Sequence, residues 1–330
     1  MGVFIFPAIV TVVVCVGAYV WGGFSALFLV VLLAVLETTL SFDNAVVNAK
    51  VLARMDAKWQ RLFLVWGIPL AVFGTRFALP IFIVAAAAGL SPIVVTELAI
   101  FDPVHYGEYI EGAHVAIAAF GAAFLFMVSL KYFFNVRKTV HWISMIERYL
   151  SRWGGIEAIE VALTLAVLLV CAFLLPIKAA TILTAGIIGV VLFVIIEGIA
   201  QSFEMAGASA AGVGMALFIY LNILDAAFSL DGVVAAFAIT TSLPVIIAGL
   251  GIGAVFVRAF TVYLVRANTL KNLIYLEHGA HWAILGLAGA MLATIFVKVP
   301  EAITGLIGLL FVTLAYVSSR REMQRTTPRQ

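Results

Sequence analysis

The sequence predicts an all-α fold, a polytopic bundle of about ten transmembrane helices with an inverted internal repeat. Hydrophobic residues make up 65% of the 330 residues and charged residues 11%, whereas an ordinary soluble domain contains roughly 25% charged residues. Many apolar runs reach about 20 residues, the length that a helix needs to cross the hydrocarbon core of a bilayer. In addition, one acidic pattern occurs twice inside these runs.

Ten apolar runs are candidate membrane spans. They cover approximately residues 4–21, 24–50, 61–88, 112–134, 157–175, 179–203, 212–240, 243–266, 279–298 and 300–318. The first run has no basic segment before it and no small-residue cleavage site after it, so we interpret it as a retained helix rather than a signal peptide. Residues 136–155 combine aromatic, aliphatic and basic side chains, which predicts a cytoplasmic helix lying on the inner leaflet. The whole chain, 1–330, is then a single transmembrane domain.

The basic residues predict the orientation of the chain. Lysine and arginine gather in residues 50–61, 131–152, 266–271 and 320–329, whereas residues 91–111 carry four acidic side chains and no basic one. By the positive-inside rule the four basic regions are cytoplasmic and 91–111 is an outer loop. Ten spans then leave both termini in the cytoplasm, and we expect a bacterial inner-membrane protein. The net charge of +2 is too small to indicate nucleic-acid binding.

The internal repeat is marked by three landmarks in the same order. The acidic pattern reads Glu37-Thr-Thr-Leu-Ser41-Phe-Asp43-Asn44 in the first copy and Asp225-Ala-Ala-Phe-Ser229-Leu-Asp231-Gly232 in the second. An arginine follows inside the next helix, at Arg76 and Arg258, and a Gly-Ala-His triplet opens the helix after that, ending at His114 and His281. On the predicted topology the copies run in opposite directions, so residues about 24–135 and 212–298 form inverted halves. Transporters often have this plan, with the substrate site near the midplane where the halves meet.

The acidic residues fall on two faces of each motif helix. At 3.6 residues per turn, Glu37, Ser41, Asn44 and Asn48 form one narrow polar stripe, and its counterparts in the second copy are Asp225, Ser229 and Gly232, joined by Asn222. Asp43 and Asp231 lie about 240° from the leading carboxylates. Either each helix packs on both sides, or it unwinds at the Ser-x-Asp step so that carboxylates and freed carbonyls converge. We expect the break, because broken helices build ion sites in transporters and because Asn and Gly tolerate unusual dihedrals.

The side chains in these motifs are ligands for a hard cation. Carboxylate, amide and hydroxyl oxygens suit Mg²⁺, Ca²⁺ and Mn²⁺. A nitrogen ligand from His114 or His281 would shift the preference toward Mn²⁺; the alternative is that each histidine is hydrogen-bonded at a helix end. Glu197 begins an imperfect third acidic pattern that is a further contributor, an inner gate or simply a polar helix end.

The charges of the two copies do not cancel. Glu37, Asp43, Asp225 and Asp231 are opposed by Arg76 and Arg258, which leaves two negative charges and matches one divalent cation. A charged side chain at membrane depth usually faces a partner or a water-filled cavity. The alternative is that all six side chains form buried ion pairs that fix the packing of the helices, at a considerable desolvation cost.

The segments from Glu37 to Asn48 and from Asp225 to Ala236 resemble the TerC family of integral membrane proteins, in particular its bacterial branch known as a domain of unknown function. The resemblance covers roughly residues 24–298. It implies a role named for tellurium resistance and export of manganese or related divalent ions, with Glu37, Asp43, Asn44, Asp225 and Asp231 at the acidic motif positions. The chain departs from the family in its predicted number of spans and in having Gly232 where the first motif has Asn44.

The leading hypothesis is therefore a non-enzymatic exporter of a divalent cation, with Mn²⁺ favoured over Ca²⁺ and Mg²⁺, and protons are a reasonable counter-ion because carboxylates bind metal and protons competitively. An exporter of cationic metabolites such as basic amino acids is the first alternative, because carboxylates also neutralise ammonium groups and aromatic rings bind cations. An intramembrane aspartyl protease is the second, because two aspartates can share a proton and activate water. Asp231-Gly232 has the wrong order for the Gly-x-Gly-Asp pattern of such proteases. An accessory protein that hands metal to a secretion partner would share the same residues.

Overall fold

The computed structural model describes residues 2–205, 210–266, 273–297 and 299–326, and the regular structure in these residues is helical. In chain order the helices are η1 (Gly2–Phe4), α1 (Ile5–Leu40), α2 (Phe42–Leu52), α3 (Ala57–Pro69), η2 (Leu70–Ala78), α4 (Leu79–Ala88), α5 (Pro92–Phe101), α6 (Pro103–Phe133), α7 (Ser144–Trp153), α8 (Ile159–Leu174), η3 (Pro176–Lys178), α9 (Ala179–Met205), α10 (Ala210–Ile239), α11 (Leu243–Arg266), α13 (Leu276–Thr294) and α14 (Glu301–Thr326).

The predicted helical membrane bundle is confirmed. Within the described residues, six helical stretches are long and apolar enough to cross a membrane: 5–40, 57–88, 103–133, 176–202, 212–237 and 243–266. All ten predicted apolar segments fall on helices, the first two on α1 and α2. The segment 91–111, which we expected to be a loop, instead contains α5 and the first turns of α6. Ser91 and Asp102 begin these two helices by accepting hydrogen bonds from backbone amides of the first turn.

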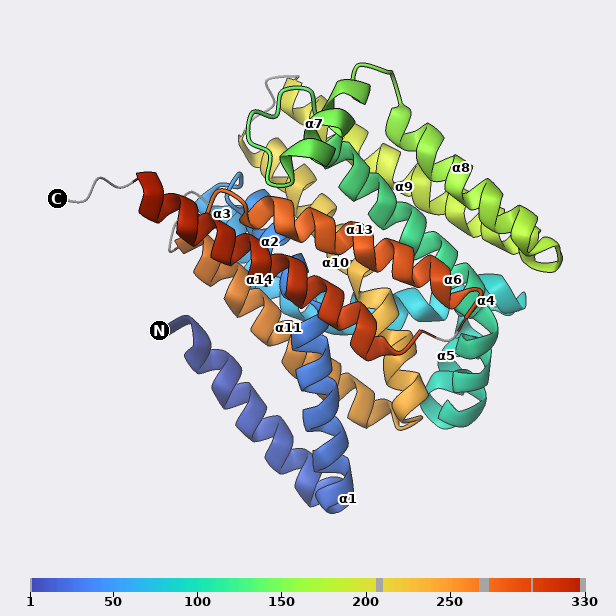
Figure 1. Cartoon of the computed structure of the whole chain (residues 1–330). Coiled ribbons are helices and arrows are strands. Elements are labelled where there is room, and N and C mark those ends of the chain that lie inside the picture. The colour runs from blue at the N-terminus through green and yellow to red at the C-terminus, as the bar shows by residue number, and fades with distance from the viewer. Residues whose placement is uncertain (1, 206–209, 267–272, 298, 327–330) are drawn as a thin grey trace.

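Helix α1 is a bent hairpin rather than one straight rod. Gly22 and Gly23 leave the helical conformation, and Gly23 has a φ of +66°, a region that favours glycine because it has no Cβ. The two halves of α1 therefore fold back on each other and project from one end of the bundle (Figure 1). The second half leads directly into α2 and carries the first acidic motif into the centre of the molecule.

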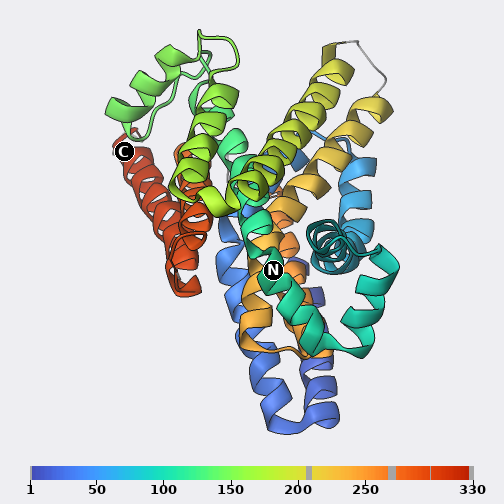
Figure 2. The ribbon, with the colours of Figure 1, turned by 90° about the vertical axis from the view of Figure 1, so that its right-hand side faces the viewer.

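The two motif helices run in opposite directions through the bundle. The second half of α1, with α2, leads toward the end that holds the α2–α3 connection and α7, whereas α10 leads away from that end (Figure 2). The start of α1 and the last turns of α14 lie toward that same end in Figure 1. The basic segments in the α2–α3 connection, around α7 and in the last turns of α14 thus share one end of the molecule, as the predicted topology requires.

The largest core cluster packs α6 against α13. Ala119, Ala122 and Ala123 of α6 are fully buried together with Ala280 and Ala288 of α13. Small side chains allow helix backbones to approach closely inside a membrane. This pair of helices packs against the motif helices, since residues of α2 and α10 belong to the same cluster.

Helix α7 is fastened to α13 by one buried carboxylate. Glu147 is fully buried and accepts hydrogen bonds from Trp282 Nε1 at 3.0 Å and Lys138 Nζ at 3.1 Å, and His278 Nδ1 lies 2.7 Å from its Oε2. Burial by itself would raise the pKa of the Glu147 carboxyl, but the hydrogen bonds and charges of His278, Trp282 and Lys138 outweigh it and lower the pKa to about 2. The amphipathic segment predicted over 136–155 thus contains a helix held by an ionic cluster.

Candidate functional site

The first motif begins with a residue in a buried ion pair. Glu37, in the last turn of α1, is 1% exposed and pairs with Arg76 of η2. Ser41 Oγ donates to Glu37 Oε1 at 3.1 Å, and Arg76 Nη1 donates to the carbonyl oxygen of Ala71 at 2.9 Å. The nine residues of η2 form a π-helical stretch, and such wide turns often occur at functional sites. The local backbone thus carries Arg76 to the carboxylate of Glu37.

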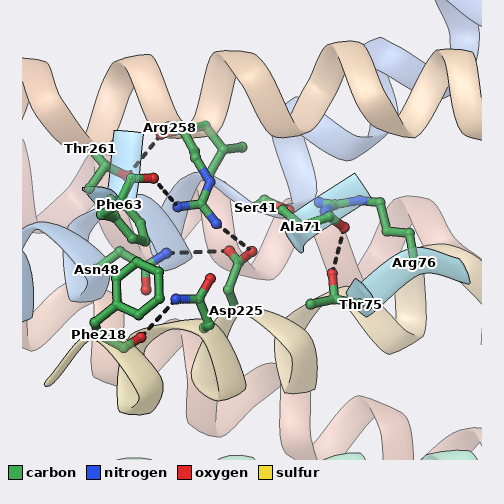
Figure 3. A network of polar contacts seen from close by, with 12 residues as sticks. Ser41, Asn48, Phe63, Ala71, Thr75, Arg76, Phe218, Asp225, Arg258 and Thr261 are labelled. Carbon is green, nitrogen blue, oxygen red and sulfur yellow. Dashed lines mark hydrogen bonds and ion pairs between the residues drawn. The ribbon is translucent and has the colours of Figure 1, made fainter. Parts of the chain in front are cut away.

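The second motif forms the equivalent ion pair. Asp225 of α10 lies 3.4 Å from Arg258 Nη2 of α11 and accepts a hydrogen bond of 3.4 Å from Asn48 Nδ2 (Figure 3). The guanidinium of Arg258 lies 3.9 Å from the ring centroid of Phe63 and donates to the Phe63 carbonyl oxygen at 3.2 Å. A Cβ at Gly67 would lie 2.0 Å from Arg258 Nη1, so only glycine leaves room for this arrangement.

The contacts join the two motifs into one buried polar cluster, which we define as Glu37, Ser41, Asn48, Arg76, Asp225 and Arg258. In each half the leading carboxylate pairs with the arginine of the same half, as a repeat predicts. Arg76 is also attracted electrostatically to Asp225, whereas Arg258 and Arg76 repel each other. The first motif reaches the second through Asn48 and Asp225.

Gly232 has a specific packing role in this cluster. A Cβ at Gly232 would lie 2.7 Å from Glu37 Oε2, a distance at which atoms overlap. The second motif therefore carries glycine where the first carries Asn44, because the carboxylate of the opposite motif occupies the space. The sequence showed this asymmetry, and the structure supplies its physical reason.

The expected unwinding is reduced to a one-residue interruption in the first motif and is absent from the second. Ser41 separates α1 from α2 and has φ −98° and ψ 15°, but its amide still bonds Glu37 O and its carbonyl still accepts from Ala45 N. The interruption is one residue long and keeps these backbone bonds. Helix α10 continues through Ser229 and Gly232, so the predicted break is wrong there.

Because the helical twist is kept, Asp43 lies on the other face of its helix. It is 1% exposed, and a Cβ at Gly308 of α14 would lie 3.7 Å from its carboxylate. The first motif helix thus packs on both sides, which was the alternative to the break. Its counterpart Asp231 lies on α10, but the position of its side chain falls outside the described part of the structure.

Several oxygens on the motif helices are buried without a hydrogen-bond partner. These atoms are Asp43 Oδ1, Asn44 Oδ1, Asn48 Oδ1, Asn222 Oδ1 and Ser229 Oγ. Buried polar atoms are nearly always paired, so each exception calls for an explanation such as a bound water or ion. One of them belongs to the polar cluster, since Asn48 binds Asp225 through its nitrogen, and another is next to it in sequence, since Ser229 follows Asp225 by one helical turn.

The histidines and Glu197 make other contacts. His281 donates from Nδ1 to the Glu277 carbonyl oxygen at 2.8 Å and stacks on Tyr132 with centroids 3.7 Å apart. His114 is half-buried on α6, near the charges of Lys178 and Glu111. Glu197 accepts a hydrogen bond of 2.7 Å from Gln201. In the described part of the chain, no three or more His, Cys, Asp or Glu side chains come together as a group that could hold a metal ion; Glu37 and Asp225 face arginines instead.

Phe63 and Gly67 were missed by the sequence reasoning. Both lie in an apolar run, in which phenylalanine and glycine are ordinary residues and indicate no function. The available signal was Arg258 itself, because an arginine inside a membrane helix needs a carbonyl, a carboxylate or an aromatic face. The buried cluster at Glu147 was missed for a similar reason, since its partners His278 and Trp282 are about 130 residues away in the sequence.

Comparison with known proteins identifies the family. A family model described as "Protein of unknown function (DUF475)" matches residues 42–326, most of the chain. The chain belongs to the DUF475 family. The DUF475 match begins just after Ser41, so it includes Asp43, Asn48, Asp225 and both arginines but leaves Glu37 outside. No curated protein and no solved structure matches the chain.

Proposed function

We propose that this DUF475 protein is a membrane transporter that exports a divalent cation, with Mn²⁺ the preferred substrate. The observation that carries the proposal is the set of unpaired buried oxygens around the polar cluster, where the antiparallel motif helices meet. Amide, hydroxyl and carboxylate oxygens are the ligands that Mn²⁺, Mg²⁺ and Ca²⁺ prefer. The resemblance of both motifs to the TerC family supports the choice of manganese.

The arginines have a defined part in this mechanism. With Arg76 on Glu37 and Arg258 on Asp225, these two buried carboxylates are neutralised without a substrate. An incoming cation replaces the guanidinium group as the partner of Asp225 and takes further oxygens from Asn48 and Ser229. The exchange leaves Asp225 paired with a cation at each stage, which limits the desolvation cost of this carboxylate in the membrane interior.

The direction of transport and its energy source form part of the same proposal. The end of the bundle with the basic segments is the cytoplasmic end by the positive-inside rule, which places both termini in the cytoplasm of a bacterial inner membrane. Carboxylates bind metal only when deprotonated, so protons compete with the cation and serve as the counter-ion. Export of Mn²⁺ is then inhibited as the pH at the site falls.

A flux measurement on the purified protein in proteoliposomes tests this function. Mn²⁺, Ca²⁺, Mg²⁺ and lysine are offered in turn under a controlled pH gradient. We expect Mn²⁺ flux in the wild type, its loss in Asp225→Asn, and full flux in Glu108→Gln, which removes an exposed carboxylate in the first turns of α6. Equal Mn²⁺ flux in Asp225→Asn and Glu108→Gln would refute the proposal.

One contact favours a second candidate, an exporter of cationic metabolites. Asp225, the ring of Phe63 and its carbonyl oxygen together hold a guanidinium group, that of Arg258. A free arginine or lysine substrate would find a carboxylate and an aromatic face in the same place. If this candidate is right, lysine or arginine flux exceeds Mn²⁺ flux in the same proteoliposomes, and Phe63→Leu reduces it.

A further inference from the structure

A cavity of about 770 Å³ is lined by residues of two of the basic segments, among them Arg54, Lys131 and Arg137, and so lies at the end of the bundle that carries these segments. It is lined by residues of α2, α6, α9, α10 and α13. Its rim is charged: Lys50 pairs with Glu277, and Lys131 Nζ lies 3.1 Å from Glu160. The exposed side chains of Lys50 and Lys131 show that the cavity communicates with solvent.

Part of the wall of this cavity is apolar. Val51 of α2 and Leu217 of α10 line it, and both belong to a buried cluster with Leu221 and Phe63. Leu221 and Phe63 are fully buried. We call Val51, Leu217, Leu221 and Phe63 the apolar layer.

The polar cluster begins on the other side of the apolar layer. The ring of Phe63 carries the guanidinium of Arg258, which pairs with Asp225. Asn48 precedes Val51 by three residues on α2, and Asp225 follows Leu221 by one turn on α10. At 1.5 Å per residue these steps are about 4.5 and 6 Å along the helix axes. On α2 the cavity lining reaches Val47, beside Asn48, and on α10 it reaches Tyr220, five residues before Asp225, so the cavity ends within about two helical turns of the buried ion pairs.

We infer that the cavity is a cytoplasmic vestibule and that the apolar layer is the hydrophobic gate between it and the polar cluster. Narrow apolar constrictions stop ions because water leaves them, and a small displacement of their side chains rewets the path. The role of the gate in transport rests on the proposed function. The access of water to one side of the layer does not, since it follows from the cavity alone.

Single-cysteine labelling tests the vestibule without any transport measurement. Cys15 and Cys171 are first replaced by alanine, and Val51→Cys, Leu217→Cys or Leu221→Cys is added to that background. Each protein is treated with a membrane-impermeant thiol reagent in inside-out and in right-side-out vesicles. Arg152→Cys on α7 and Glu108→Cys on α6 are the controls for the two faces, because both side chains are exposed and lie toward opposite ends of the bundle.

We expect Val51→Cys and Leu217→Cys to react from the same face as Arg152→Cys, and Leu221→Cys to react at least ten-fold more slowly. Failure of both lining positions to react, reaction from the Glu108→Cys face, or equal rates at Leu217→Cys and Leu221→Cys would each overturn the inference. Two lining positions are used so that one poorly folded variant does not decide the result, and folding is checked by the elution of each variant on size exclusion.

The labelling result and the flux result are separable. Labelling as expected without Mn²⁺ flux would leave the vestibule and refute the proposed function, whereas flux without labelling would refute the vestibule alone. With flux present, Leu221→Ala thins the apolar layer and should raise the rate of Mn²⁺ movement several-fold. Leu250→Ala is the matched control, since Leu250 is equally buried but lies in the core cluster of α1 and α11. An unchanged rate in Leu221→Ala would contradict the gate.

Discussion

The contact between Gly232 and Glu37 gives the most specific stability prediction. In Gly232→Ala the new Cβ would lie 2.7 Å from Glu37 Oε2. The carboxylate has little freedom to retreat, because Arg76 and Ser41 hold it. Overpacking a buried site costs about 1–3 kcal/mol, and a shift that breaks the buried ion pair with Arg76 costs up to about 3–5 kcal/mol. Alanine in a helix recovers only about 1 kcal/mol relative to glycine.

We therefore expect Gly232→Ala to lower the free energy of unfolding by about 2 kcal/mol or more. Gly251→Ala in α11 is the matched control, because its Cβ would meet Val72 at an ordinary contact distance of 3.8 Å, and it should be neutral or slightly stabilising. Thermal unfolding of both variants in the same detergent, followed by tryptophan fluorescence, measures the difference. Equal midpoints for the two variants would refute the packing of Gly232 against the Glu37 carboxylate.

Three further predictions concern the contacts of Arg258 and of Glu147. Gly67→Ala should displace Arg258 from Phe63 and Asp225, since its Cβ would lie 2.0 Å from Arg258 Nη1. We expect the free energy of unfolding to fall by about 3 kcal/mol or more in the same assay. A decrease no larger than that of Gly251→Ala would disprove this displacement. Glu147→Gln should loosen α7, seen as faster amide hydrogen exchange over 144–153, while Glu157→Gln, an exposed carboxylate, should leave exchange unchanged. Because the pKa of Glu147 is lowered from 4.5 to about 2 in the folded protein, the stability that its carboxylate contributes is fully present above pH 4.5 and is lost as the pH falls toward 2. Protection of the α7 amides from hydrogen exchange that stays constant over that pH range would contradict the ionic anchor.

The sequence predicted which side chains matter but not all of their partners. Charges stand out in apolar runs, so Glu37, Asp225, Arg76 and Arg258 were identifiable from spacing alone. The pairing of each carboxylate with the arginine of its own half is consistent with the repeat. For these four residues the structure shows ion pairs, the arrangement that we had considered as the alternative to a cation site.

Other features depend on neighbours that a single sequence does not reveal. Helical periodicity put Asp43 on a separate face but could not show that Gly308 of α14 covers it. The unbroken course of α10 is a further example, because glycine permits a break without requiring one. The roles of Phe63 and Gly67 depend on the packing of α3 against Arg258, which a single sequence does not reveal.

Binding of Mn²⁺ to the purified protein tests the central claim most directly, namely that the buried oxygens of the two motif helices hold a divalent cation. Equilibrium dialysis in detergent at neutral pH measures the number of ions per chain. The account predicts one saturable Mn²⁺ per chain in the wild type and in Glu108→Gln, with weaker binding in Ser229→Ala and none in Asp225→Asn. Equal binding by Asp225→Asn and Glu108→Gln, or no saturable binding by the wild type, would contradict it.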